Sequence, residues 1–278
     1  MSQNMWDCFR LEAPTTQESS VLLPNSYFQR SKQTLQQKIL LTLKKKSIIQ
    51  KIMASLILLF SSLIYALTFY PIFFQLNAMV TKFESTVLLP DASPDKQSPA
   101  NDYQGFWPGL ETGNADFVFQ NVIFNWNPDL KPGEWSLFPS WCCKLVKVHP
   151  GDTINSTFAL DDSTGISNDE WDVTRGQQGK AAGQGPFSGS LLFDPTTATV
   201  FDAVPYTMAI LTIELQEEAT WDFGSATWTD ITIEAVTTDT SCPTSFSSLK
   251  WPASQGIAST SGGKTSCYYA KIVLEGPI

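Results

Sequence analysis

The chain has 278 residues, enough for one large or two small domains, and its hydrophobic content of 42% is ordinary for a globular protein. The formal net charge of −9 is unevenly spread: residues 1–51 hold eight Lys/Arg and three Asp/Glu, which leaves ten bases against 24 acids in residues 52–278. So acidic a body excludes nucleic-acid binding by phosphate neutralisation, and no nucleic-acid partner is expected.

The N-terminal part predicts a membrane anchor. Residues 1–47 are polar and basic, which predicts a disordered cytosolic tail. Residues 48–76 are expected to form a transmembrane helix, because Ile52–Phe74 is a continuous apolar run and about 20 such residues span a bilayer. A buried core helix and a cleaved signal peptide are the alternatives. The lysines that precede the run predict a cytosolic N-terminus, with the rest of the chain luminal or extracellular.

The remaining residues predict a linker and one β domain. Residues 77–105 are assigned to the linker, and residues 106–278 to a mainly β domain, an antiparallel concanavalin-like sandwich or jelly roll. Short segments with β-branched and aromatic residues, separated by turn residues, carry this prediction. The expected strands are 117–126, 140–148, 153–160, 170–175, 188–194, 206–215, 227–236 and 267–275.

Cysteines and a sequon fit a non-cytosolic domain. Four cysteines follow the apolar run, an even number that suits disulfides, and Cys242 with Cys267 is the preferred pair. Asn155 begins the chain's only Asn-x-Ser/Thr sequon, which predicts glycosylation. With one histidine, His149, and no Cys-x-x-Cys pair, no metal site is expected, and His149 before Pro-Gly is interpreted as a turn residue. No cofactor-binding signature is found, so no cofactor is expected.

Three segments resemble the eqolisin, or glutamic peptidase, family of fungal proteins. Trp135–Gly165 resembles the middle of the family sequence, with its Trp-rich strand, Gly-Asp-x-Ile strand entry and Ser/Thr-Gly hairpin. Ala209–Glu218 resembles the family strand that carries the catalytic glutamate, and Trp221–Glu234 the strand after it. The resemblance implies a concanavalin-like sandwich, a catalytic Glu214, and Gln120 as the counterpart of the catalytic glutamine. With an anchor in place of a propeptide, the chain looks closer to non-peptidase relatives.

Three functions remain open. The first is a membrane-anchored, cofactor-independent cyclase or isomerase of fungal secondary-metabolite biosynthesis, in which Glu214 provides acid–base catalysis on an apolar small molecule. Its groove would be lined by tryptophans: Trp107, Trp126, Trp135, Trp141, Trp171 and Trp221. The second is an acid endopeptidase, in which Glu214 activates water and the amide of Gln120 stabilises the oxyanion. The third is a lectin-like carbohydrate-binding module.

Overall fold

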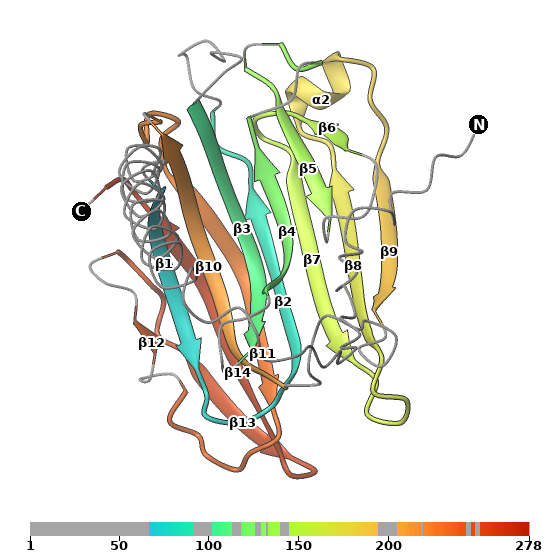
Figure 1. Cartoon of the computed structure of the whole chain (residues 1–278), viewed down its shortest axis with the longest axis vertical. Coiled ribbons are helices and arrows are strands. Elements are labelled where there is room, and N and C mark those ends of the chain that lie inside the picture. The colour runs from blue at the N-terminus through green and yellow to red at the C-terminus, as the bar shows by residue number, and fades with distance from the viewer. Residues whose placement is uncertain are drawn as a thin grey trace, which may run out of the picture. The chain divides into compact units, whose positions relative to one another are not determined.

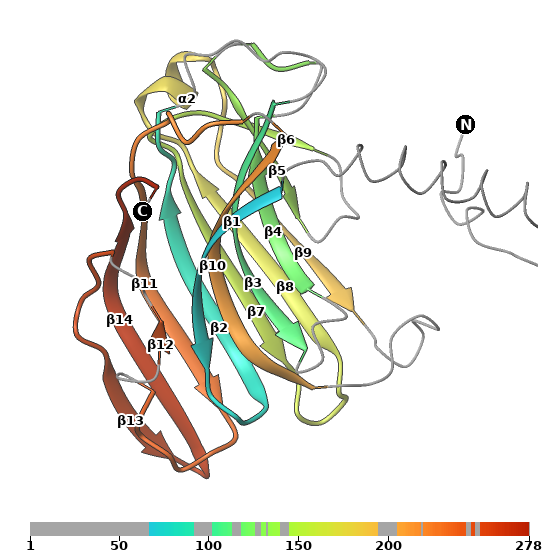
Figure 2. The same cartoon turned by 60° about the vertical axis from the view of Figure 1, so that its left-hand side comes forward.

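The computed structural model describes residues 67–91, 102–112, 118–125, 129–131, 133–139, 145–193, 205–217, 219–242, 246–247 and 251–277. These residues all belong to one compact unit, Tyr65–Ile278. Their strands form two antiparallel sheets that lie face to face (Figures 1 and 2). The mainly β, sandwich-like architecture predicted from the sequence is therefore confirmed.

The first sheet, sheet A, has the strand order β12-β1-β10-β3-β4-β5-β6 in the described residues. Its strands are β1 (Leu67–Gln75), β3 (Asp102–Thr112), β4 (Val118–Phe124), β5 (Trp135–Pro139), β6 (Val146–Val148), β10 (Tyr206–Glu217) and β12 (Phe246–Ser247). The two longest, β3 and β10, pair side by side in the middle of the sheet.

The second sheet, sheet B, has the order β13-β14-β11-β2-β7-β8-β9. Its strands are β2 (Val80–Leu88), β7 (Thr153–Leu160), β8 (Ser167–Thr174), β9 (Phe187–Phe193), β11 (Ala226–Ala235), β13 (Ile257–Ser261) and β14 (Lys264–Leu274). One short helix, α2 (Gln177–Ala181), lies at one end of the sandwich between β8 and β9 in the chain (Figure 1).

In both sheets, successive side chains of a strand point alternately to the core between the sheets and away from it. β8 shows the burial expected when every second residue faces a core, with Trp171 and Val173 inside and Asp172 outside. In sheet A the odd-numbered side chains of β10, such as Ile213, join the core between the sheets, so the even-numbered ones face away from it. This second set forms the outer face of sheet A.

Aromatic side chains fill the space between the sheets. Phe106 lies edge-on to Trp135 and to Trp228, with ring centroids 5.1 Å and 6.3 Å away, and Phe119 meets Phe158 of sheet B at 5.3 Å. Trp135, Trp228 and Phe158 are completely buried. Each such ring removes a large apolar area from water, and edge-to-face contacts add about 0.5–1.5 kcal/mol per pair.

The N-terminal boundary differs from the sequence prediction. Leu67–Gln75, the last part of the expected helix 48–76, is strand β1, so the prediction was wrong over these residues. Ile72 and Phe74 are buried against the core while Phe73 between them is exposed, which is a strand pattern and not a helix pattern. Residues 48–66 lie outside the described residues. Within the described residues no helix has the length and apolar character needed to cross a bilayer.

The sandwich also begins earlier than residue 106. The proposed linker 77–105 contains β2, which lies between β7 and β11 in sheet B, and the start of β3. Polar side chains on one face of β2, such as Lys82 and Glu84, gave this strand a hydrophilic composition, yet Phe83 and Val87 on its other face belong to the core.

The predicted disulfide is confirmed. Cys242 and Cys267 are bonded, with Cα atoms 6.3 Å apart, and both side chains are buried. Cys142 and Cys143 lie outside the described residues.

Candidate functional site

The outer face of sheet A carries a second, smaller apolar cluster. Trp107 of β3, Val122 and Phe124 of β4 and Ile210 of β10 are all less than 7% exposed, although they face away from the core between the sheets. Tyr103, Val118, Phe138 and Met208 pack around them. The cluster is therefore a small second core, and a ligand on this face would contact the half-buried side chains around it.

Besides Glu111 of β3, the pKa of which is raised by burial, this face carries the carboxylate of Glu214. It lies on β10 and is half-buried. Its Oε2 accepts a hydrogen bond from the indole Nε1 of Trp107 at 2.9 Å, and its Oε1 accepts one from the amide Nε2 of Gln216 at 2.6 Å. Two donors therefore hold the carboxylate in one orientation beside the apolar cluster. Charge-assisted hydrogen bonds of this type are stronger than neutral ones.

Tyr103 lies on β3, the strand that pairs with β10, and its side chain is close to the Glu214 carboxylate. The residue opposite Glu214 on β3 is Gly105, and a Cβ added there would come within 2.9 Å of the Tyr103 hydroxyl. Only a glycine therefore lets the Tyr103 ring lie over β3 at this level, where it stacks on Phe124 at 5.7 Å. Burial, and secondarily the charge of Glu214, raise the pKa of Tyr103, so its hydroxyl stays protonated and can donate.

Gln120 shares the outer face but does not lie beside Glu214. Gln120 pairs with Gly109, which pairs with Ile210, four residues before Glu214 along β10. Two strand spacings and four residues of strand rise separate the Cα atoms by roughly 17 Å. The amide of Gln120 is 7% exposed, and its Oε1 accepts no hydrogen bond within the described part of the chain. The pair implied by the family resemblance is therefore not assembled around one water.

The tryptophans predicted for the groove are divided among several places. Trp107 lies on the outer face of sheet A and is 6% exposed, and its role in a groove stays a prediction. Trp135 and Trp171 are buried between the sheets and so do not line a groove, whereas the half-buried Trp221 packs against the core beside Tyr70 and Phe223. Trp126 and Trp141 lie outside the described residues.

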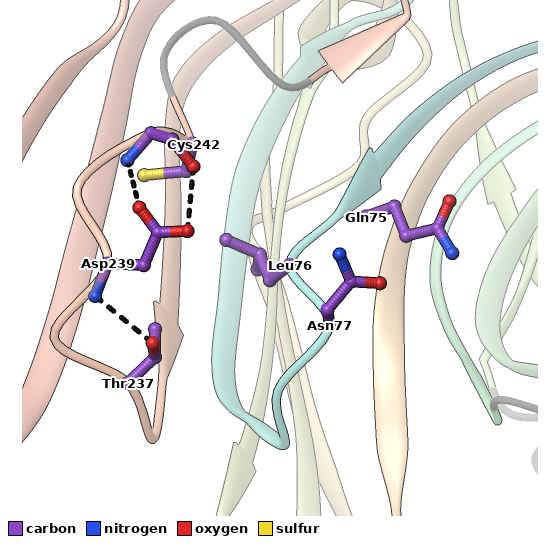
Figure 3. A pocket seen from close by; sticks show the side chains of 7 residues that line it. Gln75, Leu76, Asn77, Thr237, Asp239 and Cys242 are labelled. Atoms are coloured by element: carbon purple, nitrogen blue, oxygen red, sulfur yellow. Dashed lines mark hydrogen bonds between the residues drawn. The ribbon is translucent and has the colours of Figure 1, made fainter.

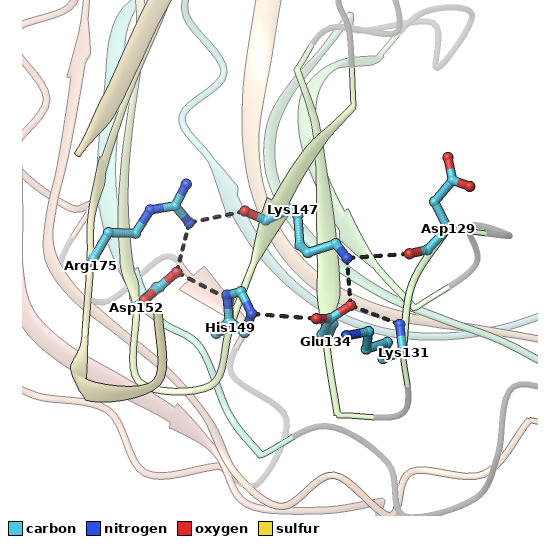
Figure 4. A network of polar contacts seen from close by, with 7 residues as sticks. All are labelled: Asp129, Lys131, Glu134, Lys147, His149, Asp152 and Arg175. Atoms are coloured by element: carbon cyan, nitrogen blue, oxygen red, sulfur yellow. Dashed lines mark hydrogen bonds and ion pairs between the residues drawn. The ribbon is translucent and has the colours of Figure 1, made fainter. Parts of the chain in front are cut away.

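His149 belongs to a polar network at the end of β6 (Figure 4). Its backbone N–H donates to Asp152 at 3.0 Å, and its Nε2 lies 3.6 Å from Glu134. Asp152 is completely buried and pairs with Arg175 at 2.8 Å, and Glu134 pairs with Lys147 at 2.8 Å. The carboxylates pair with the Lys, Arg and His side chains, which indicates a structural role in fixing the turns between β5, β6 and β7, and the buried Nδ1 of His149 has no partner within the described residues.

A small pocket lies between the β1–β2 turn and the loop after β11 (Figure 3). Its acid, Asp239, accepts hydrogen bonds from the backbone and hydroxyl of Ser241 at 2.8 Å, and these bonds lower the pKa of Asp239. Cys242 in its wall is held in the disulfide. The pocket thus presents an acid already used in a turn, and it is a weaker candidate than the outer face of sheet A.

The sequon residue Asn155 lies on β7, with its side chain on the outer face of sheet B. It is half-buried, and its Nδ2 donates to the hydroxyl of Thr86 at 3.0 Å. Its glycosylation stays a prediction.

Sequence reasoning missed Tyr103, Gly105 and Gln216. Gln216 had a usable signal, because a residue two positions from Glu214 on a strand shares its face. Tyr103 and Gly105 had none, since their segment was assigned to the linker and strand register is not visible in a sequence.

Comparisons with known proteins add little to this geometry. No family model and no curated protein matches the chain. Two solved structures of scytalido-glutamic peptidase are similar, one with a peptide-based transition-state analog (TM-score 0.45) and one with a transition-state analog inhibitor (TM-score 0.38). Each alignment has 12% identity and covers 74% of this chain and 100% of the peptidase chain.

Proposed function

We propose that the chain is a membrane-anchored, cofactor-independent acid–base catalyst that isomerises or cyclises an apolar small molecule, of the kind that secondary-metabolite pathways produce. One observation carries the proposal: two hydrogen-bond donors orient the Glu214 carboxylate beside an apolar, aromatic cluster on the outer face of sheet A. A general base of this kind needs to be held in reach of its substrate proton, and the donors Trp107 and Gln216 hold it.

The chemistry requires no co-reactant. The Glu214 carboxylate accepts a proton from one position of the substrate, and the electron pair of the broken bond moves into the adjacent π system. The resulting carboxylic acid returns the proton at another position, so atoms and charge balance. The protonated hydroxyl of Tyr103 donates a hydrogen bond to the oxygen on which negative charge develops. The aromatic side chains around it exclude water, which strengthens this interaction.

Gln120 then has a binding role in place of a catalytic one. Its buried amide oxygen accepts no hydrogen bond within the described residues, and its Cα lies on the same face at roughly 17 Å from that of Glu214, with the apolar cluster between them. A buried polar group without a partner is costly and is relieved by a ligand that pairs with it. The arrangement fits an elongated apolar substrate that carries a polar group at the end remote from the reacting centre.

Gene replacement tests the proposal. The gene is deleted and restored as the wild type, as Glu214→Gln or as Glu234→Gln, and small molecules are profiled. Glu234 is a matched control because it ends the same Thr-Ile-Glu tripeptide on β11 of the other sheet. We expect an unprocessed intermediate to accumulate in the deletion and in Glu214→Gln, and to disappear with the wild type and Glu234→Gln. Normal product from Glu214→Gln would refute the proposal.

The peptidase alternative makes a different prediction for the same variants. A glutamic peptidase would cleave denatured casein at acid pH and lose this activity in Glu214→Gln. The separation of Gln120 from Glu214 argues against it, because the amide cannot stabilise an oxyanion formed at that distance. Acid casein cleavage that depends on Glu214 would favour the peptidase.

The proposed location is a single-pass membrane protein with a cytosolic N-terminus and the sandwich in the lumen or outside the cell. The disulfide Cys242–Cys267 supports it, because disulfides persist in oxidising compartments. Protease added to intact microsomes should spare the sandwich and remove only the N-terminal tail. Digestion of the sandwich without detergent would place it in the cytosol and refute this topology.

A further inference from the structure

One strand of sheet A exposes an unusual amount of apolar surface. Leu67, Phe69 and Phe73 of β1 are 52%, 45% and 37% exposed. They are odd-numbered residues of one strand, so all three side chains leave β1 on the same side, the outer face of sheet A. No other described strand exposes three large apolar side chains. We call these three residues the β1 strip. A group of this kind marks a binding surface more often than a scattered single residue does.

The β1 strip forms the rim of the Glu214 site. Phe69 is the register partner of Glu214 on the neighbouring strand β10, and Phe73 is the partner of Ile210 in the apolar cluster. On the other side of β1, the short strand β12 pairs only with Phe73 and Phe74. Within the described residues, the strip therefore lies at an open edge with direct access to the candidate site.

The residues that precede β1 in the chain indicate which surface the β1 strip contacts. Residues 52–66 contain no charged side chain, and β1 follows them at Leu67 without any linker. The predicted helix begins at residue 48, and its part before β1, residues 48–66, would rise about 28 Å as an α-helix, close to the roughly 30 Å thickness of the hydrocarbon core of a bilayer. An anchor formed by these residues would thus end near the outer surface of the bilayer. The residues that follow, beginning with Leu67, would then start at the bilayer interface.

We propose that the β1 strip rests in the bilayer interface, so that the Glu214 site opens onto lipid and takes a substrate dissolved in the membrane. The inference rests on the proposed anchoring and on the proposed role of Glu214. It adds that the substrate is lipid-soluble and reaches the site from the membrane. β1 contains no charged residue, and its neighbour Glu214 is an acid, so the strip offers no cation to lipid phosphates. Contact should therefore be hydrophobic and independent of anionic lipid.

Photo-cross-linking in defined vesicles tests the contact. The full chain is reconstituted in phosphatidylcholine vesicles with Phe69→p-benzoylphenylalanine, and in parallel with Leu192→p-benzoylphenylalanine. Leu192 is a matched control because it is 68% exposed on β9, at the far edge of sheet B. After illumination, mass spectrometry of the peptides should find severalfold more phosphatidylcholine adduct at position 69 than at position 192. Adding phosphatidylserine should leave the yield unchanged.

The results of these experiments distinguish three proposals: the lipid contact of the β1 strip, the membrane anchor and the catalytic role of Glu214. No lipid adduct at position 69 in vesicle-bound protein, or an adduct to a second copy of the chain, would overturn the proposal while leaving the anchor intact. Release of the chain by alkaline carbonate would refute the anchor, and the proposal with it. If position 69 labels lipid but Glu214→Gln still gives normal product in the gene replacement, the lipid contact holds and the catalytic role of Glu214 fails.

Discussion

Trp107 links the apolar face of sheet A to its carboxylate. Trp107 is buried in the outer-face cluster, and its indole N–H donates to Glu214. Trp107→Phe keeps an aromatic ring and removes the donor. Because hydrogen bonds to charged groups contribute about 1.5–3 kcal/mol, we expect a loss of about 2 kcal/mol in the free energy of unfolding, measured by urea denaturation. Product formation in the gene-replacement assay should fall as well.

The control for this variant is Trp221→Phe. The Trp221 indole donates at 2.7 Å to the backbone carbonyl of Gly224, so this change also removes one indole hydrogen bond, but away from Glu214. It should reduce stability and leave product formation normal. Equal loss of product in both variants would mean that Trp107 acts through general stability and not through the carboxylate.

At the residue scale, a sequence identifies types of side chain better than their neighbours. Glu214 was named because Ala209–Glu218 resembles the strand that carries the catalytic glutamate of the eqolisin family. Its partners are Gln216, two residues away, and Trp107, 107 residues away in sequence. The first follows from strand alternation alone. The second depends on the register of β3 against β10, which no local pattern specifies, and the registers of β10, β3 and β4 also place Gln120 away from Glu214.

The hairpin of β5 and β6 is fixed by a charged network that makes its stability depend on pH. Burial opposes ionisation of Glu134, but the backbone N–H of Lys131, the Lys147 ammonium and His149 outweigh it and lower the pKa of Glu134 below its ordinary value of 4.5. A carboxylate with a lowered pKa in the folded state stabilises the fold above the ordinary pKa. This stability is lost as the pH falls through the lowered value.

Glu134→Gln should therefore destabilise the domain by about 1–2 kcal/mol at pH 7, and the difference from the wild type should shrink as the pH falls below 4.5. Urea denaturation between pH 3.5 and pH 7 measures this. Glu275→Gln, at an exposed glutamate near the C-terminus, should follow the wild-type profile throughout. A Glu134→Gln difference that stays constant with pH would contradict the charged role.

At the element scale, strands with a clean two-residue alternation were predictable. β7 occupies the predicted residues 153–160, because its polar and apolar residues alternate. β1 was not predictable in this way, because it is apolar on both faces and continues an apolar run. Its sequence is Leu-Thr-Phe-Tyr-Pro-Ile-Phe-Phe-Gln. A strand that is buried on one side and exposes apolar residues on the other has the composition of a membrane segment, and composition alone cannot separate the two.

At the scale of the whole molecule, one segment of chain connects the two sheets and is closed by the disulfide. After β11 of sheet B, the chain passes to β12 at the edge of sheet A and returns to β13 and β14 of sheet B. Cys242 lies before this excursion and Cys267 lies within β14, so the bond joins its two ends. The hydroxyl of Tyr269 also donates to the carbonyl of Cys242 at 2.6 Å.

Replacing both cysteines by alanine tests how much this closure contributes. Closing a loop with a sequence separation of 25 residues lowers the entropy of the unfolded chain, a contribution of about 3 kcal/mol to the free energy of unfolding. We expect a loss of that size by urea denaturation. Reductant should lower the wild type to a similar level and should add no loss from this bond in the double variant, which already lacks it. A wild type that reductant does not affect would mean that the bond does not stabilise the sandwich.

The same double variant should also change hydrogen exchange in β1. Because β12 pairs with Phe73 and Phe74, a looser segment should weaken the protection of the β1 amides, next to the rim of the Glu214 site.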